Sequence, residues 1–444
     1  MNKQTSRRKF LADTTAFAGA SVIHASTSIA AQQTTNFKAG DRKEGMFWRI
    51  HWFEDGAQHS NPGYEYNVRF RVNAPEVVLH PTLGKRSEPR GNGMMLIKAE
   101  EDLSLLAEAE LYLEMWGGHP ATANKRLTIN GHTTYQIPEI GTADFNCTHQ
   151  YPVFPLKLTD LVNGYNAVQF ACDQGNSFWG HFIIDHAALR AALKKDHPDL
   201  LKAGLTGFNA TVKAVTNQNE SIALSLNVPD EMKALISTVD YQGWYAGYDE
   251  KGNGLVTDWH GYTKNRQPMS FIAANVSAPF TASWETAMLP NQQELGARAI
   301  IHFKDHPELI YVTAPARGIA FPNHGAQTVT LYRSYDLPRP FWSRNKNRNH
   351  CTIELNLDPK EIERAELHVV VWDGGAGGVK DYFTLNGKPF EIAGKGKHDV
   401  IYSTVKLDSA LLKRGANRIE LYSDTENHGI EVMLPGPALM IRRK

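Results

Sequence analysis

Cysteine is scarce in this chain of 444 residues, and so is any excess of charge. Forty-seven basic and 47 acidic side chains give a formal net charge of zero. A general nucleic-acid binder would need a basic excess or a basic patch, so no nucleic-acid partner is expected. The three cysteines are Cys147, Cys172 and Cys351. A disulfide between the first two and a pair of buried free thiols are both compatible with the sequence.

Long hydrophobic runs and familiar catalytic motifs are also missing. No stretch of about 18 apolar residues follows the N-terminal segment, so no membrane-spanning helix is expected. There is no Gly-x-Ser-x-Gly elbow, His-Glu-x-x-His pair, phosphate loop or Gly-x-Gly-x-x-Gly turn. This favours a binding protein over an enzyme. A glycoside hydrolase stays open because its two carboxylates can come from any part of a chain, and 16 Tyr and 18 His leave a polysaccharide lyase open.

The first residues present an export signal. Residues 6–11 read SRRKFL, the twin-arginine pattern, and a mildly apolar stretch leads to small residues at Ala30 and Ala31. We therefore predict a twin-arginine signal peptide over residues 1–32 and a periplasmic or secreted protein.

Helix is scarce as well, and strand patterns dominate. Only residues 186–201, rich in Ala and Leu, favour a helix. Alternating or continuous apolar runs with β-branched and aromatic residues predict strands at 66–72, 110–115, 167–172, 221–226, 298–303, 327–332, 351–357, 366–372 and 418–422. Turn dipeptides such as Asn-Gly separate them. Short strands at this spacing predict an all-β chain built of β-sandwiches.

The sequence also repeats itself. AELYLEMWGG at 109–118 is matched by AELHVVVWDGG at 365–375. The distance that separates Trp116 from Trp372 also separates Asn130 from Asn386, each in an Asn-Gly turn that favours a hairpin. One spacing shared by a tryptophan and a turn indicates a duplicated structural unit.

Each copy continues with a second motif. Leu385-Asn386-Gly387 is followed by LKRGAN at 412–417, and Ile129-Asn130-Gly131 by LVNGYN at 161–166. This order resembles the galactose-binding-like jelly roll of carbohydrate-binding modules and of the sugar-binding domains of β-galactosidase-type hydrolases. The segment between the copies resembles an immunoglobulin-like or fibronectin-type sandwich. The resemblance implies three β-sandwich domains, at 35–195 (jelly roll with an N-terminal extension), 205–325 (immunoglobulin-like) and 326–444 (jelly roll).

A sugar site needs an aromatic face for the pyranose and planar polar groups for its hydroxyls. Two loops in each copy offer both. The candidate ligand-binding residues are Trp116, His119, Asp173, Asn176, Trp179, His181, Trp372, Asp373, Asp424, Asn427 and His428. Packing is the favoured role for the tryptophans at 116 and 372, whereas turn capping and ligand binding are equally compatible with the aspartates at 173 and 424.

Two further patterns have a structural and a functional interpretation. Asp249 and Asn253 match part of a calcium loop, although Lys251 and His260 replace expected ligands, so a tight hairpin is favoured over a structural calcium ion. No cofactor is otherwise predicted. The aromatic block 47–55, which contains His51 and Asp55, could line a groove with the Asp173 loop. An edge strand that covers hydrophobic surface is the favoured interpretation.

These observations support three functions. The first is a monomeric, exported protein that binds a polysaccharide or oligosaccharide without catalysis. The second is a lyase or glycoside hydrolase with a cleft between the first jelly roll and the middle domain, drawing on His51, Asp55, Asp173, Trp179 and His181. The third is a structural protein of the cell envelope.

Overall fold

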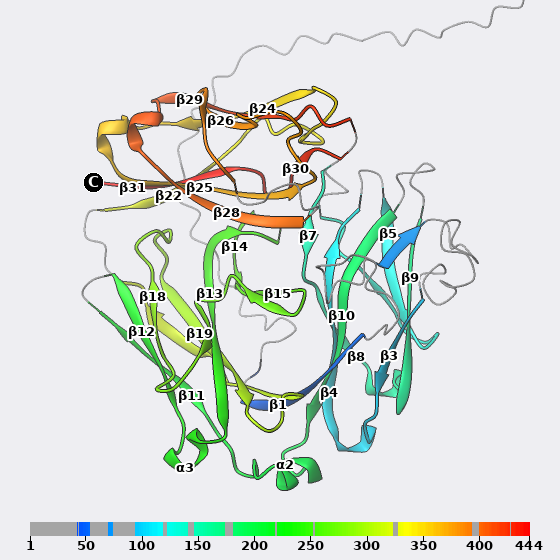
Figure 1. Cartoon of the computed structure of the whole chain (residues 1–444). Helices are drawn as coiled ribbons and strands as arrows, with labels where there is room; N and C mark the ends of the chain where they lie inside the picture. The colour runs from blue at the N-terminus through cyan, green and yellow to red at the C-terminus, as the bar shows by residue number, and fades with distance from the viewer. Residues whose placement is uncertain are drawn as a thin grey trace, which may run out of the picture. The chain divides into compact units, whose positions relative to one another are not determined.

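The all-β fold predicted from the sequence is confirmed by a computed structural model of the chain (Figure 1). The structure describes residues 42, 44–53, 70–73, 94–118, 122–140, 146–173, 181–217, 220–251, 254–322, 327–392, 399–426 and 428–444. Helical pieces among these residues are short: α2 (Pro198–Lys202), α3 (Asp230–Lys233), and the 3-10 turns η2 (Leu103–Leu105), η3 (Leu158–Asp160), η4 (Pro359–Glu361) and η5 (Ser409–Leu411). No helix in these ranges is long and apolar enough to cross a membrane.

The largest element is a sheet of twelve strands. Its main order is β14-β13-β19-β20-β1-β10-β4-β7, and β17, β21, β2 and β8 pair beside this path. The strands are β1 (Met46–Trp52), β2 (Phe70–Asn73), β4 (Leu106–Trp116), β7 (His149–Gln150), β8 (Val153–Leu156), β10 (His181–Leu193), β13 (Ile236–Asp249), β14 (Gly254–Trp259), β17 (Ala273–Val276), β19 (Glu294–Phe303), β20 (Leu309–Val312) and β21 (Ala316–Ala320).

Strand β1 joins the two halves of this sheet. It pairs antiparallel with β10 on one side, where Trp48 lies opposite Ala192, and with β20 on the other, where Trp48 lies opposite Ile310. Figure 1 shows the sheet bending at β1, so that β13 and β4 stand on opposite sides of it. The aromatic N-terminal block therefore forms a central strand, and our prediction of an edge strand was wrong.

The sheet is one layer of two sandwiches. Its β4 and β10 pack against a four-stranded sheet, β3 (Met94–Ala99), β9 (Gly164–Asp173), β5 (Ala123–Ile129) and β6 (Thr134–Gln136). Its β13 and β19 pack against a three-stranded sheet, β11 (Thr211–Thr216), β12 (Ser221–Asn227) and β18 (Thr281–Glu285). A separate hydrophobic core fills each sandwich. Both cores lie on the same face of the twelve-stranded sheet, and this leaves its other face free to form a site.

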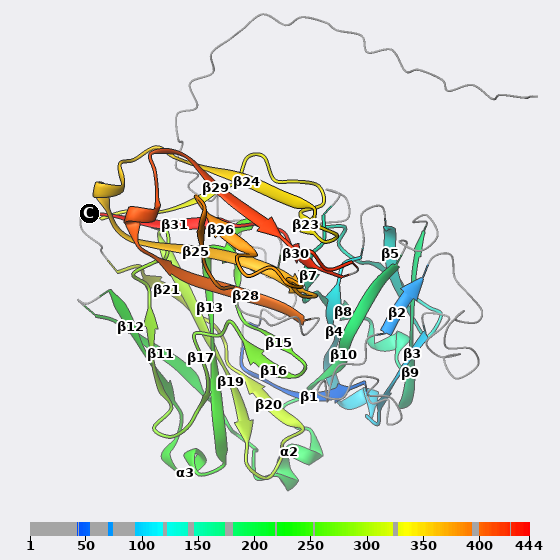
Figure 2. The same ribbon diagram turned by 45° about the horizontal axis from the view of Figure 1, so that its top comes forward.

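The C-terminal segment forms a further sandwich with its own core. A six-stranded sheet consists of β22 (Val329–Arg333), β31 (Ala438–Arg443), β25 (Ile362–Asp373), β30 (Ile430–Val432), β23 (Trp342–Ser343) and β28 (Asp399–Leu407). It packs against β24 (Arg348–Leu355), β29 (Gly415–Tyr422), β26 (Phe383–Leu385) and β27 (Lys388–Pro389), and Figure 2 shows both layers.

The repeated motif forms the same hydrogen-bond network in both copies. The Asn130 side-chain amide donates to Asn166 Oδ1 at 2.9 Å, and the Asn386 amide donates to Asn417 Oδ1 at 2.9 Å. Asn130 and Asn386 also share a left-handed backbone, with φ of 47° and 51°. The matched residues thus fix a turn and a strand start rather than a binding site. The domain boundaries that we derived from the repeat stay a prediction.

The helix predicted at 186–201 was wrong. Residues 181–193 form strand β10, and only the five-residue α2 follows. Strand β10 pairs with β1 at one edge and with β4 at the other, and its residues are buried on either face, as the fully buried neighbours Ala187 and Ala188 show. A strand buried on both faces loses its alternation of polar and apolar residues, and its Ala- and Leu-rich run then looks like a helix.

A small cluster connects the C-terminal sandwich to the first half of the chain. Trp116 packs with Cys147, Tyr248, Val370 and Met433. The Tyr248 hydroxyl donates to the Gly436 carbonyl at 2.8 Å. All three cysteines are free and buried, so Cys147 and Cys172 are not joined in a disulfide.

Glu431 lies beside this cluster and gives the fold a pH dependence. Burial raises its pKa from 4.5 to about 7, while Arg344 and the Cys147 thiol oppose the rise. Between pH 4.5 and about pH 7 the Glu431 side chain keeps its proton in the folded chain but releases it in the unfolded chain. The free energy of unfolding therefore falls as the pH rises through this range. We expect Glu431→Gln to be about 3 kcal/mol more stable than wild type at pH 8 and unchanged at pH 4. Urea unfolding at both pH values tests this, and an equal effect at both would contradict it.

Candidate functional site

A cavity of about 1000 Å³ lies on the face of the twelve-stranded sheet opposite the two cores. The strand register places its lining residues in rows across the strands: Glu110 of β4, Arg190 of β10 and Ile50 of β1 form one such row. One wall comes from β4, β8 and β10, and the other from β13, β14 and β19. Protein cavities that bind small molecules span about 300–1000 Å³, so this one is at the large end.

Strand β1 forms the floor of the cavity by simple alternation. Successive side chains of a strand point to opposite faces. Trp48, Ile50 and Trp52 line the cavity, whereas Phe47 points to the other face and packs in the middle core. His51, which we proposed as a catalytic candidate, also points away, and its Nε2 lies 2.7 Å from Glu101 Oε1.

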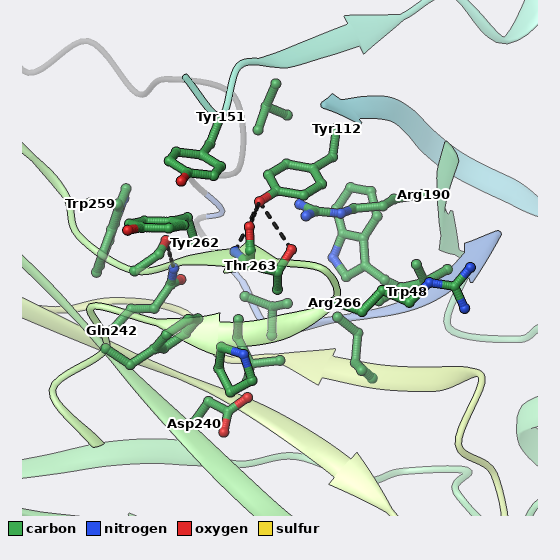
Figure 3. Close-up of a pocket in the computed structure, with 18 of the residues that line it drawn as sticks. Trp48, Tyr112, Tyr151, Arg190, Asp240, Gln242, Trp259, Tyr262, Thr263 and Arg266 are labelled. Atoms are coloured by element: carbon green, nitrogen blue, oxygen red, sulfur yellow. Dashed lines mark hydrogen bonds between the residues drawn. The ribbon is translucent and has the colours of Figure 1, made fainter. Parts of the chain in front are cut away.

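Arginines cover the faces of three aromatic rings in the cavity wall. The Arg190 guanidinium lies 4.1 Å from the centre of the Tyr112 ring, and Figure 3 shows the two side chains next to each other. The other two pairs are Arg298 over Trp259 at 4.2 Å and Arg266 over Trp52 at 5.0 Å. A guanidinium at this distance is attracted to the ring and restricts its orientation.

Two polar groups of the middle segment reach the cavity from β13. Asp240 accepts the backbone N–H of Asn275 at 2.7 Å, and its Oδ2 lies 2.9 Å from His302 Nε2. Gln242 accepts from Arg298 at 2.7 Å through its carbonyl oxygen and donates to the carbonyl of residue 261 through its amide. These partners hold planar polar side chains in fixed positions on the wall.

A hairpin of β15 (Tyr262–Lys264) and β16 (Gln267–Met269) fills part of the space between β13 and β4 (Figures 1 and 2). Glu114 of β4 binds the hairpin from the opposite wall. Its carboxylate accepts from the Thr263 hydroxyl at 2.7 Å and from the Asn265 backbone N–H at 2.8 Å. Burial raises the pKa of Glu114 to about 7, and these hydrogen bonds oppose the rise.

Tyrosines complete the contact between the hairpin and the first wall. The rings of Tyr151 and Tyr262 stack with centres 3.7 Å apart. The Tyr112 hydroxyl accepts the Thr263 N–H at 2.9 Å (Figure 3). Both contacts join segments that lie more than 100 residues apart in the sequence. The cavity wall is therefore continuous from one half of the sheet to the other.

The residues that we predicted as ligand contacts, as far as the structure describes them, do not line this cavity. His119, Asn176, Trp179, Asn427, Asn253 and Asp55 are outside the described residues, and of His181 only its place at the start of β10 is described. Trp116 is buried in the cluster with Cys147, so it packs as we expected. None of the predicted residues that the structure describes is among those lining the cavity.

The described aspartates among them hold turns or ion pairs. Asp173 pairs with Arg126 at 2.7 Å and accepts from Asn124, and these hydrogen bonds lower its pKa. Asp373 accepts the Gly375 N–H at 2.9 Å. Asp424 similarly accepts the Gly378 N–H at 2.8 Å. Their role as ligand contacts stays a prediction.

The remaining candidates lie at strand ends. Trp372 and His428 meet edge to face, with ring centres 6.0 Å apart. Asp249 ends β13 and accepts the Lys251 N–H at 2.8 Å, as expected of a tight hairpin. Among the described residues, no group of three or more His, Cys, Asp or Glu side chains is placed to hold a metal ion.

The sequence contained one signal of the cavity. The alternation of Trp48, Ile50 and Trp52 marks one face of β1 as aromatic, but the pattern does not show what that face meets. The cavity's polar residues lie in strands that pair across large sequence separations, such as β1 with β20. No local motif connects them.

Comparisons with known proteins leave the family open. No family model matches the chain, and no curated protein matches it. Among solved structures, a β-porphyranase of glycoside hydrolase family 86 from the human gut bacterium Bacteroides plebeius is 14% identical with a TM-score of 0.23. The match covers 52% of this chain and 36% of that one.

Two further solved structures show a similar level of likeness. A glycoside hydrolase family 86 protein in complex with neoagarooctaose is 12% identical, with a TM-score of 0.24 and coverage of 53% and 33%. A β-glycosidase from Bacteroides vulgatus is 11% identical, with a TM-score of 0.19 and coverage of 62% and 33%. This chain thus spans about a third of the length of each. At these TM-scores the likeness carries no argument about activity.

Proposed function

We propose that the protein is an exported carbohydrate-binding protein and that the cavity on the twelve-stranded sheet holds its saccharide ligand. The observation that carries the proposal is the combination of aromatic side chains with fixed amide and carboxylate groups around one cavity of about 1000 Å³. Aromatic rings pack against the C–H face of a pyranose, while planar polar groups bind its hydroxyls. The volume supports a ligand of more than one sugar ring.

The proposed site is the cavity on the twelve-stranded sheet and not the loops of the two repeats. Trp52 is half-buried and lies on the cavity floor, and Phe271 is half-buried on the wall formed by the middle segment. Both side chains therefore keep part of their surface exposed, whereas Trp48 is nearly fully buried and supports the floor from within.

Replacing Trp52 with alanine is expected to weaken saccharide binding at least tenfold, because the ligand loses a stacking surface. Affinity electrophoresis against a panel of soluble polysaccharides identifies a ligand, and calorimetry with an oligosaccharide of the retained polymer gives the Kd. Tyr335→Ala is the matched control, since Tyr335 is 70% exposed and does not line the cavity. If the wild-type protein binds no polysaccharide of the panel, or if the two variants lose the same amount of saccharide affinity, the proposal is contradicted.

A glycoside hydrolase or lyase is the second candidate, and a pair of carboxylates on one cavity wall favours it. Asp240 and Asp258 are carboxylates that line the wall formed by the middle segment, and two carboxylates are what most glycoside hydrolases require. Reducing ends or ultraviolet-absorbing unsaturated products, measured on the same panel, separate catalysis from binding. If the wild-type protein forms products, and Asp258→Asn forms none while it still binds the saccharide, the enzymatic function would take the place of the proposed non-catalytic binding.

A further inference from the structure

The charged side chains around the cavity are balanced in number. Four carboxylates, from Glu110, Asp240, Asp258 and Glu308, line it together with four cationic groups, from Arg190, Lys251, Arg266 and Arg298. With histidine neutral, the lining has no formal net charge. Sites for acidic glycans concentrate cations, because each sulfate or carboxylate needs a charge-assisted partner.

The three arginines are each held by the protein on two sides. Arg190 lies 3.2 Å from Glu110 and over Tyr112. Arg298 donates to Gln242 at 2.7 Å and lies over Trp259. An anionic sugar would have to use the remaining N–H donors of a guanidinium whose position is already set by its acceptor and its ring.

The third arginine follows the same pattern. Arg266 donates to His186 Nε2 at 2.9 Å and lies over Trp52. His186 lies in β10 and is buried, and the hydrogen bond that it accepts is partly buried. All three arginines thus combine at least one polar acceptor with one aromatic ring that lines the cavity. This arrangement suits a guanidinium that orients a ring rather than one that binds a ligand.

The carboxylates are held in a similar way. Glu110 is paired with both Arg42 at 3.0 Å and Arg190, and it is only 4% exposed. Asp240 is paired with His302, and Glu308 lies 3.5 Å from His306 Nδ1. Uncharged polar groups also line the cavity, among them the amides of Gln150, Gln242, Gln267 and Asn275 and the hydroxyls of Ser237, Thr238 and Thr263.

We infer that the saccharide is an uncharged one, a neutral oligosaccharide held by aromatic stacking and by amide and hydroxyl hydrogen bonds. The arginines are positioning residues in this scheme: they fix the orientation of the aromatic rings and do not bind a charged group of the ligand. The inference rests on the proposed function, because it assigns the ligand class of the same cavity.

The test measures binding of wild-type protein to neutral and acidic probes at two salt concentrations. The neutral probes are cello-, xylo-, laminari- and agaro-oligosaccharides, and the acidic probes are oligogalacturonate, alginate and carrageenan oligosaccharides. We expect the tightest binding to a neutral probe, with a Kd that changes less than about twofold between 0.02 and 0.5 M NaCl, because salt screens charge–charge attraction. Tightest binding to an acidic probe that weakens tenfold or more with salt overturns the inference and leaves the proposed function intact. Binding to no probe overturns both.

A pair of variants tests the role of the arginines. Arg298→Lys keeps the charge but loses the planar group that stacks on Trp259, and Arg298→Gln loses both. We expect both to weaken binding of the neutral probe about fivefold or more. If Arg298→Lys keeps its full affinity while Arg298→Gln loses affinity, the ligand binds through the positive charge at this position. That result would overturn the inference. If neither variant folds, the salt dependence of wild type decides the question alone.

Discussion

Replacing Asn417 with alanine is expected to lower the free energy of unfolding by about 3–5 kcal/mol. Asn417 is fully buried, and its carbonyl oxygen accepts from the Lys413 backbone N–H at 2.8 Å and from Asn386 at 2.9 Å. Its amide donates to the carbonyls of Lys413 at 2.8 Å and Gly415 at 2.9 Å. Alanine leaves these donors and acceptors without partners inside the protein, and each such group costs about 1–3 kcal/mol.

The duplication supplies a test of this prediction within one chain. Asn166 holds the equivalent place in the first copy, where its amide donates to the Val162 and Gly164 carbonyls. Asn166→Ala is therefore expected to cost a similar amount in denaturant unfolding. Asn356→Ala is the control, since Asn356 is exposed and accepts one hydrogen bond, from Tyr332. Its effect is expected to stay within about 0.5 kcal/mol. A cost for Asn417→Ala as small as that of the control would show that the network is not structural.

The elements that could be predicted from the sequence are those whose cause is local. Alternation and β-branched residues marked strands such as β12 and β29, which the structure confirms. The Asn-Gly turns at 130 and 386 could be predicted because an asparagine and a glycine tolerate the left-handed backbone that the turn requires. Each of these patterns acts within about ten residues, which is the range that a sequence motif can report.

What could not be predicted depends on strand order. Strand β10 was mistaken for a helix because its side chains are buried by packing against segments that lie far away in the sequence. The cavity was missed for the same reason. Its floor comes from β1, at residues 46–52, and its walls come from strands that begin at residue 106 and extend to residue 303. The pairing of β1 with β10 on one side and β20 on the other brings them together, and the aromatic face of β1 gave no indication of these partners.

Replacing Phe47 with alanine is expected to lower the free energy of unfolding by about 3–5 kcal/mol, the usual cost of removing a buried phenylalanine. Its ring packs against those of Phe208 at 5.7 Å, Phe303 at 5.8 Å and Tyr311 at 4.9 Å. Strand β1 joins both halves of the largest sheet, so the cavity left by this ring weakens the contact between them. Guanidinium unfolding, followed by tryptophan fluorescence, measures the loss.

The contrast with Trp52 makes this prediction specific to one face of β1. Phe47 and Trp52 belong to the same strand but point to opposite faces of the sheet. Phe47→Ala should therefore lower stability while the folded protein still binds its saccharide, whereas Trp52→Ala should weaken binding with a smaller loss of stability, because its ring is only half-buried. If Phe47→Ala leaves stability unchanged, or if the two variants lose binding equally under conditions where both are folded, β1 does not separate a core face from a ligand face. The assignment of the cavity as the binding site would then lose its structural basis.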